Sequence, residues 1–220
     1  MKVCVLGSNG FIGKNLVHKT NWTGVTRQEL DLLNQKQVEE YFTKNQYDVV
    51  IHCAASIDQG SESTTYKNII MFENVVRIFK GKLIYFSSGA ALRGDPPTDP
   101  YGLSKWIIDR RILTIPNAYI LRVWGCYGPG ELSTRFSAVC REKGHVVINK
   151  DRYFDFVDIE CVRKVVFDYV HGYLDDKEYN LVYPEKLLLS QWAERFGATW
   201  EIGDKDGLGD SYISSIPSSF

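Results

Sequence analysis

Hydrophobic positions along this chain alternate between short β-branched runs and longer amphipathic stretches. The short runs predict buried strands at residues 2–7, 22–27, 47–55, 82–88 and 118–125. The stretches between them predict helices at 11–20, 34–45 and 64–80, and another beginning near 101. Alternation of this kind is typical of an α/β fold with a doubly wound parallel sheet, which resembles a Rossmann fold. Ligands of such sheets bind beyond the carboxyl ends of the strands.

The pattern loosens after about residue 125. We therefore expect a dinucleotide-binding, Rossmann-like core at 1–125. Residues 126–220 are expected to be a mixed segment that contributes the last sheet elements and a small C-terminal lobe covering the substrate. The last twelve residues, 209–220, are interpreted as a loose tail.

A glycine-rich turn, "GSNGFIG", joins the first predicted strand to the first predicted helix. Gly7 permits the tight turn, Gly10 lets the backbone approach a pyrophosphate, and Gly13 lets the helix pack on the strand. Free N–H groups at a helix start, together with the helix dipole, favour phosphate. We expect the turn to bind a dinucleotide through Gly7, Asn9, Gly10, Phe11, Ile12 and Gly13.

The end of the second predicted strand reads "GVTRQE". An acid there usually holds the ribose hydroxyls of NAD, whereas an arginine accommodates the extra phosphate of NADP. Arg27 stands there without an acid, so NADP is the expected cofactor. Glu29 keeps NAD open as the alternative.

Tyr101 and Lys105 in "YGLSK" lie four residues apart and therefore share one helix face. A nearby ammonium stabilises a phenolate and brings tyrosine closer to useful acid–base chemistry. The strand sequence "YFSSGAA" supplies Ser88, or its neighbour Ser87, as a hydroxyl for a substrate carbonyl on the same rim as the glycine turn. A tyrosine–lysine pair alone is structural in most proteins, but these features in this order predict a catalytic site.

Composition narrows the function classes. The chain has 220 residues, 44% of them hydrophobic, a formal net charge of -1 and no long basic run, so neither nucleic acid nor a membrane surface is an expected partner. Its five cysteines are scattered without zinc-ligand spacing, so no metal site is expected. The N-terminus lacks the pattern of a signal peptide, and no apolar run is long enough to span a membrane. We expect a cytoplasmic protein.

Taken together, "GSNGFIG", "DVVIHCAA", "YFSSGAA", "YGLSK", "LRVWGCYGPG" and "DRYFDFVDI" resemble the extended branch of the short-chain dehydrogenase/reductase superfamily, the NAD-dependent epimerase/dehydratase family. The resemblance implies an NAD(P)-dependent enzyme acting on nucleotide-linked sugars. By position, Ser88 resembles the carbonyl-binding serine, Tyr101 the proton donor and Lys105 its activator, which also binds the cofactor ribose. Asn68 resembles an asparagine that helps to hold the lysine through water. Asp31 and Leu32, with Ala54 and Ala55, resemble the residues around the adenine.

Within this branch the chain looks most like GDP-fucose synthase and other NADPH-dependent 4-keto-sugar reductases. Ala90 stands where an acid–base cysteine would fall, and no histidine lies between Tyr127 and Cys140. The Thr-Asp-Glu of the 4,6-dehydratases is also missing. These departures favour simple reduction of a keto group. A C4 epimerase with tightly bound NAD is the first alternative, and a non-catalytic cofactor-binding regulator or scaffold is the second.

Two further expectations concern the substrate and the assembly. Arg135, Arg152 and Lys150 are candidates for binding the diphosphate of a nucleotide sugar, with solvated charge as an equal alternative. Related enzymes pair two helices per subunit, matching 64–80 and 101–114 here. We expect a homodimer through a surplus of apolar side chains on these helices: Ile69, Phe72, Val76, Trp106 and Ile107.

Overall fold

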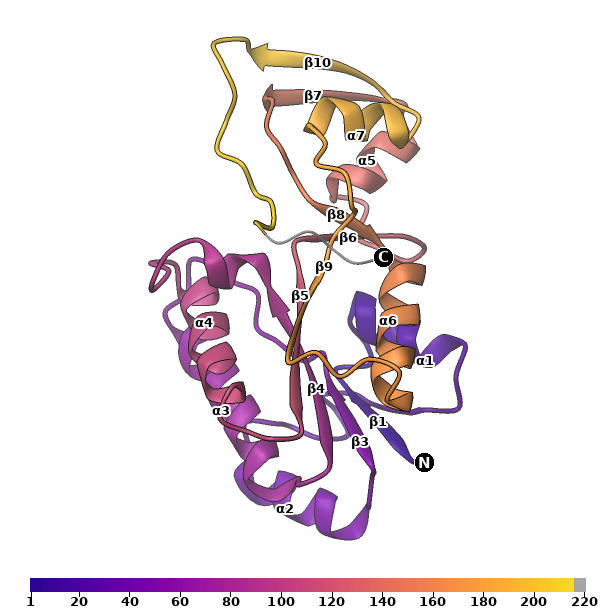
Figure 1. Ribbon diagram of the computed structural model, residues 1–220, viewed down its shortest axis with the longest axis vertical. Helices are drawn as coiled ribbons and strands as arrows, with labels where there is room; N and C mark the ends of the chain where they lie inside the picture. The colour runs from indigo at the N-terminus through magenta and orange to yellow at the C-terminus, as the bar shows by residue number, and fades with distance from the viewer. Residues whose placement is uncertain (216–220) are drawn as a thin grey trace. The chain divides into compact units, whose positions relative to one another are not determined.

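A six-stranded sheet, flanked by helices, organises the computed structural model, which describes residues 1–215. Its strand order is β2–β1–β3–β4–β5–β9, and the pairs from β2 to β4 are parallel (Figure 1). The strands are β1 (Val3–Leu6), β2 (Thr23–Val25), β3 (Val49–His52), β4 (Lys82–Ser88), β5 (Ala118–Val123) and β9 (Glu178–Leu181). The fold is the Rossmann-like α/β class that the sequence pattern predicts.

Helices cover both faces of this sheet. They are α1 (Phe11–His18), α2 (Gln35–Lys44), α3 (Ser63–Ile78), α4 (Pro100–Ile112) and α6 (Ile159–His171), with a short 3₁₀ turn, η1 (Gly89–Leu92), after β4. Figure 1 shows α2, α3 and α4 on one face, and α1 and α6 on the other. Because both faces are covered, β1 and β3 are buried along their whole length, which explains their continuous apolar sequence.

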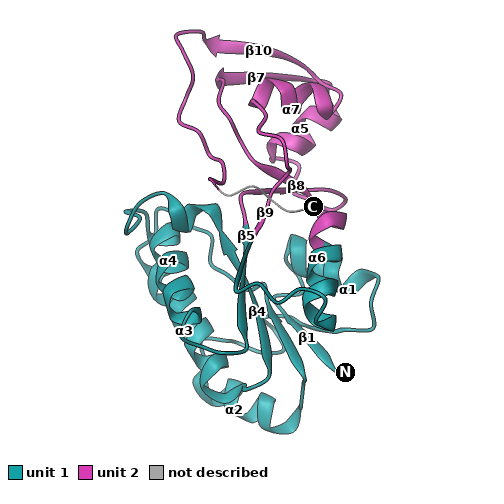
Figure 2. Ribbon diagram, viewed as in Figure 1, with its two compact units in different colours: residues 1–122, 163–179 teal, residues 123–162, 180–220 magenta. Residues whose placement is uncertain are grey.

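The chain divides into two compact units (Figure 2). Unit 1 contains residues 1–122 and 163–179, and unit 2 contains residues 123–162 and those from 180 onward. The first boundary lies close to the expected one at 125. Residues 163–179, however, return to the sheet-bearing unit, so the two units are not successive halves of the chain.

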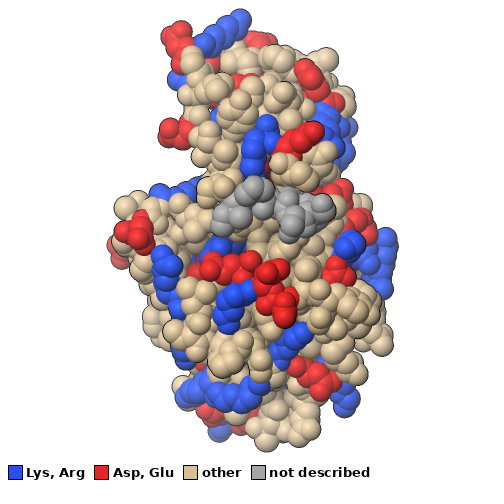
Figure 3. Space-filling view, in the orientation of Figure 1, with Lys and Arg blue, Asp and Glu red and all other residues tan. Residues whose placement is uncertain are grey.

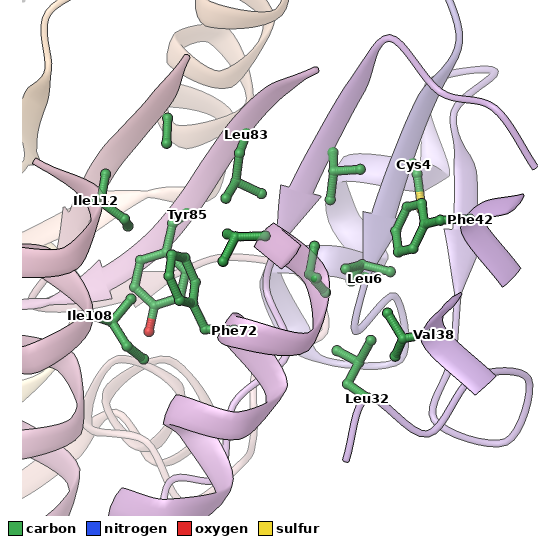
Figure 4. Packing of buried hydrophobic residues seen from close by; sticks show 14 of the residues in the cluster. Cys4, Leu6, Leu32, Val38, Phe42, Phe72, Leu83, Tyr85, Ile108 and Ile112 are labelled. Carbon is green, nitrogen blue, oxygen red and sulfur yellow. The ribbon is translucent and has the colours of Figure 1, made fainter. Parts of the chain in front are cut away.

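Unit 1 is built on a core between the sheet and the helices α2, α3 and α4. Phe72 of α3, Tyr85 of β4 and Ile108 of α4 are almost completely buried there and meet in Figure 4. Val76 also belongs to this core. Phe72 and Val76 were expected to be surplus apolar surface for a dimer; they are instead used by the fold of a single chain.

Unit 2 has its own, aromatic core. Its elements are β6 (Gly125–Tyr127), α5 (Phe136–Lys143), β7 (His145–Lys150), β8 (Phe156–Asp158), α7 (Leu189–Arg195) and β10 (Thr199–Asp204). β6 pairs with β8 and β7 with β10, both in parallel. Trp192 is fully buried and contacts Phe156 and Phe196 edge-to-face or stacked, at ring-centroid distances of 5.2 and 5.6 Å. Side chains of α5 and α7 packed against strands of the two small sheets therefore hold this unit together.

The expectation of a loose tail is wrong for its described part. The backbone of Tyr212 exchanges hydrogen bonds with Tyr153 and Asp155, and its ring packs on Phe154 at 5.2 Å. Ser214 is buried, donates from its N–H to Asp155 and bonds the Asn180 side chain. This segment is therefore part of the folded structure of unit 2. The remainder of the expected tail, residues 216–220, lies outside the described residues.

Two properties of residues 1–215 bear on possible partners. No helix there is both long and apolar enough to cross a membrane. No group of three or more His, Cys, Asp and Glu side chains in that range could hold a metal ion. On the face shown in Figure 3, acidic and basic side chains are interspersed, in keeping with the net charge of -1.

Candidate active site

The glycine turn shows which glycines the fold itself requires. Gly7 has a left-handed φ of +82°, and a Cβ there would lie 2.7 Å from the Ala54 nitrogen. A Cβ on Gly13 would lie 2.4 Å from the Gly7 oxygen. A Cβ on Gly10 would meet only that same oxygen, at an ordinary 3.4 Å. Packing therefore demands Gly7 and Gly13, whereas Gly10 keeps the space above the start of α1 open to a ligand.

That start of α1 is suited to an anion. Gly10 is its N-cap and offers no side-chain cap, so the first-turn N–H groups of Phe11, Ile12 and Gly13 are not satisfied by a capping side chain. Helix N–H groups of this kind have no intrahelical partner and carry the positive end of the helix dipole. The geometry fits a pyrophosphate.

A pocket of about 350 Å³ in unit 1 opens beside this turn. Eight of the residues expected to bind a dinucleotide line it: Gly7, Asn9, Gly10, Arg27, Asp31, Leu32, Ala54 and Ala55. Ser56, Lys67 and Gln28 line it as well and escaped the sequence analysis. In the sequence, Lys67 looks like an exposed residue of the predicted helix. The packing of α3 in the folded chain brings it to the pocket.

Arg27 and two acids, Glu29 and Asp31, lie on the loop that follows β2. Arg27 lines the pocket and is exposed. The Glu29 carboxylate accepts hydrogen bonds from the Thr26 N–H and hydroxyl, both at 2.8 Å, which lowers its pKa. Asp31 accepts the N–H of Leu33 at 3.1 Å. Each acid thus has one oxygen bonded to its own loop, and the cations that line the pocket are Arg27 and Lys67.

The start of α4 carries the expected tyrosine. Asp99 caps the helix by accepting the Gly102 N–H at 2.7 Å, and Pro100 occupies the first turn. A Cβ on Gly102 would lie 2.8 Å from the Ala90 oxygen of η1. Glycine in "YGLSK" therefore lets α4 approach the turn after β4 closely. As a result, the helix turn carrying Tyr101 packs beside η1, the turn that follows Ser88.

Lys105 is buried one helical turn beyond Tyr101. Its Nζ donates to the Tyr85 hydroxyl at 2.9 Å and to the Phe86 carbonyl at 2.7 Å. The same atom lies 5.7 Å from the centroid of the Tyr101 ring. Burial lowers the pKa of Lys105 from 10.5 to about 8, while Asp109 and Cys53 oppose the fall. The expected pair is thus brought together, with the amine beneath the phenol ring.

The two serines of β4 are held differently. Burial raises the pKa of Asp109 on α4, and the Ser87 hydroxyl is one of the groups that oppose this rise, so buried Ser87 belongs to the layer between sheet and helix. Ser88 ends the strand and caps η1 by accepting the Ala90 N–H at 3.2 Å. Its position at the strand end, on the rim where parallel strands present their ligands, keeps Ser88 as our candidate for the carbonyl.

The Asn68 side chain joins the pocket to α4 rather than contacting Lys105 directly. Its carboxamide accepts the Ser56 N–H at 2.7 Å and donates to the Ser56 carbonyl at 3.0 Å and the Ser104 hydroxyl at 2.9 Å. Ser104 in turn bonds the Tyr101 carbonyl at 2.7 Å. Asn68 therefore fixes the loop after β3 to the turn that carries the tyrosine.

The expected substrate-binding cations belong to unit 2. Arg135 is the exposed N-cap of α5. Arg152 is exposed, and its guanidinium lies 5.7 Å from the Phe154 ring centroid. Lys150 forms an ion pair with Asp204 at 3.2 Å, so its charge already has a partner.

Comparison with family models gives one match: the model of the NAD dependent epimerase/dehydratase family covers residues 3–163, well over half of the chain. No curated protein sequence matches this chain.

Comparison with solved structures gives many matches at low identity. A dTDP-4-dehydrorhamnose reductase from Bacillus anthracis, in complex with NADP, superposes with a TM-score of 0.81 at 18% identity, covering 93% of this chain and 85% of that one. A UDP-glucose 4-epimerase from Thermotoga maritima, with UDP-glucose, gives 0.76 at 18%, covering 94% and 88%. A GDP-L-fucose synthetase from Naegleria fowleri gives 0.75 at 16%, covering 91% and 83%. At such identities the likeness establishes the fold.

Proposed function

The chain belongs to the NAD dependent epimerase/dehydratase family, and from this premise we propose that it reduces a keto group on a nucleotide-linked sugar with NADPH. One observation carries the proposal: the buried Lys105 amine lies 5.7 Å from the Tyr101 ring centroid, next to the turn capped by Ser88. The residues proposed as proton donor, activating cation and carbonyl-binding hydroxyl are therefore all near the carboxyl end of β4, which supports the proposal.

These residues can meet the charge that reduction creates. When bound, the dinucleotide supplies a hydride to the carbonyl carbon of the sugar. Negative charge then develops on the carbonyl oxygen, to which Ser88 donates a hydrogen bond and Tyr101 transfers its phenolic proton. The ammonium of Lys105 stabilises the phenolate left behind and binds the nicotinamide ribose. An alcohol is formed, and the tyrosine regains its proton from solvent.

NADP is the proposed cofactor, with NAD as the alternative. We assign the pyrophosphate to the N–H groups at the start of α1 and the adenine to the wall formed by Leu32, Ala54 and Ala55. Arg27 is assigned to the 2′-phosphate, because Glu29 and Asp31 are engaged by their own loop. The NADP complex of the rhamnose-type reductase supports this choice by similarity of fold.

We expect Arg27→Ala to weaken NADPH binding by about 1–3 kcal/mol, because one charge-assisted contact to phosphate is lost. NADH lacks that phosphate, so its affinity should barely change. Titration of both nucleotides against the parent and the variant measures this. Lys36→Ala, which removes an exposed cation of α2 that pairs with Glu40 on the surface, is the control. Equal affinities for NADPH and NADH in the parent protein would contradict the assignment.

The epimerase-type neighbour supports one alternative, a C4 epimerase that returns the hydride to the opposite face of the sugar. Such an enzyme must retain its dinucleotide between the two half-reactions. Mass spectrometry of small molecules that co-purify with the protein separates the two functions. NADP that exchanges freely, with consumption of NADPH on a panel of 4-keto nucleotide sugars, supports the reductase. Tightly held NAD and interconversion of sugars without net oxidation would replace it by the epimerase.

Arg135 and Arg152 of unit 2 are proposed to bind the diphosphate of the substrate. Both are exposed, and guanidinium groups suit the bidentate recognition of phosphate oxygens. Lys150 is less suited, because Asp204 already pairs with it.

The five cysteines are free thiols, which accords with the cytoplasm as the site of the reaction.

A homodimer through α3 and α4 is proposed on a smaller apolar surface than the sequence indicates. Ile69, Trp106 and Ile107 are partly exposed, and Tyr66 on α3 is 66% exposed. Sedimentation at micromolar concentration should show a dimer, and Ile107→Glu should convert it to monomer because a buried interfacial charge lacks a partner. A parent protein that sediments only as monomer would refute the assembly.

A further inference from the structure

Four charged side chains of alternating sign form a series of neighbours in unit 1. The series begins one helical turn beyond Tyr101, at Lys105. Asp109 follows it by one turn of α4, and Arg122 of β5 donates from Nε to the Asp109 Oδ2 at 2.8 Å. Arg122 also pairs with Glu178 at the start of β9. Lys105, Asp109 and Arg122 are only 2%, 4% and 5% exposed. Burying so many charges is costly unless each has an opposite charge nearby.

The hydrogen-bond acceptors of the Lys105 amine are both uncharged. They are the Tyr85 hydroxyl at 2.9 Å and the Phe86 carbonyl at 2.7 Å. Figure 4 shows the Tyr85 side chain inside the buried cluster, with its oxygen toward Ile108 of α4. These contacts orient the amine and stabilise its charged form in part, but neither acceptor carries a negative charge.

The neighbours of Lys105 on the sheet are neutral as well. His52 of β3 is buried, which together with the nearby Lys105 ammonium lowers its pKa to about 4. Burial raises the pKa of the Cys53 thiol, although Lys105 opposes the rise. Burial also raises the pKa of Tyr85 well above its ordinary value. Near neutral pH, none of these three groups carries negative charge.

Among residues 1–215, the other ionisable groups near Lys105 are Tyr101 and Asp109 of its own helix. Burial raises the pKa of Asp109, and the charge of Arg122 and the Ser87 hydroxyl oppose that rise. A guanidinium keeps its charge at any working pH, and at 2.8 Å it holds Asp109 in the carboxylate form. Of the described groups that face Lys105, Asp109 is therefore the one that supplies a fixed negative charge.

We propose that Asp109, held ionised by Arg122, is a positioning residue that keeps the buried Lys105 amine protonated for its work with Tyr101. Its place in the reaction rests on the proposed function, whereas its effect on the charge of Lys105 does not. The expected consequence follows from the sign of the interaction. Removing the anion takes away the first of the two groups that oppose the effect of burial, so the amine loses its proton at a lower pH.

The test is a titration of ligand-free protein carrying ¹³C-labelled lysine, observed by NMR, with the Lys105 signal identified by its loss in Lys105→Met. In the parent protein the pKa of Lys105 should be about 8. In Asp109→Asn it should fall to about 7 or below, because a nearby opposite charge typically shifts a pKa by 1–3. Asp109→Glu keeps the charge and should restore most of the parent value.

Two further variants support this test, one as a control and one as an alternative to Asp109→Asn. Glu73→Gln removes a carboxylate of α3 that pairs with Arg111 on the surface at 3.0 Å, and it should leave the Lys105 titration unchanged. If Asp109→Asn fails to fold, Asp109→Asn combined with Arg122→Gln removes both buried charges, and the fall should persist. A Lys105 signal that titrates as in the parent, in whichever of these two variants folds, overturns the proposal.

A second readout separates this proposal from the proposed function. Turnover of a keto-sugar substrate should decline at high pH as Lys105 loses its proton. In Asp109→Asn this decline should begin at least about one pH unit lower. An unmoved pH profile beside a lowered pKa would overturn the positioning role. If the parent turns over no substrate, the proposed function fails, while the NMR titration still decides the charge of Lys105.

Discussion

Replacing Tyr101 by phenylalanine is expected to lower turnover of a 4-keto nucleotide sugar by about 10²–10⁴-fold, the usual contribution of general acid catalysis. The change deletes one hydroxyl from a half-buried side chain on the first turn of α4. The ring stays in place over Lys105, and no residue lining the dinucleotide pocket is altered. Folding and NADPH affinity should therefore be close to those of the parent.

The measurement combines steady-state turnover on a panel of keto-sugars with a separate titration of NADPH. Tyr173→Phe is the matched control, because it deletes the hydroxyl of a tyrosine that is 73% exposed and lies after the end of α6. Near-normal turnover by Tyr101→Phe, on a substrate that the parent reduces, would mean that "YGLSK" is only the start of a helix.

Sequence pattern predicted the parts of this fold that local physics determines. β1 and β3 are buried on both faces, so they leave a continuous apolar signal. The third predicted strand, 47–55, is nevertheless too long, because β3 ends at His52. Beyond it Cys53, Ala54 and Ala55 leave the strand to line the pocket, and the Ala54 backbone packs against Gly7. Apolar residues that face a ligand look the same in sequence as those that continue a strand.

Contacts between distant segments explain what the sequence could not predict. Tyr212 and Ser214 lie in a serine-rich stretch without periodicity, yet Asp155 and Asn180 hold them in unit 2. Asp109 is in a run of charges, "DRR", that reads as a solvated helix end. In the folded chain it is buried and paired with Arg122 of β5, thirteen residues later in the sequence. A partner of this kind is visible only once the chain has folded.

Lys105→Met is expected to have the other large effect, because the amine serves two partners. Turnover should fall by about 10²–10⁴-fold, since Tyr101 loses the cation that makes its proton transferable. NADPH binding should also weaken, by roughly 10- to 100-fold, through loss of a charge-assisted hydrogen bond to the ribose. The split distinguishes it from Tyr101→Phe, which should change turnover alone.

The protein should tolerate this change. Methionine fills a similar volume in the space beside Tyr85, and it removes a buried charge whose desolvation lowers the pKa of Lys105 to about 8. Asp109 keeps Arg122 as its partner. Denaturant unfolding should confirm a folded variant, and Lys44→Met on the exposed end of α2 should match the parent in every measurement. Unchanged NADPH affinity in folded Lys105→Met would show that the amine does not bind the dinucleotide and leave it only its role beside Tyr101.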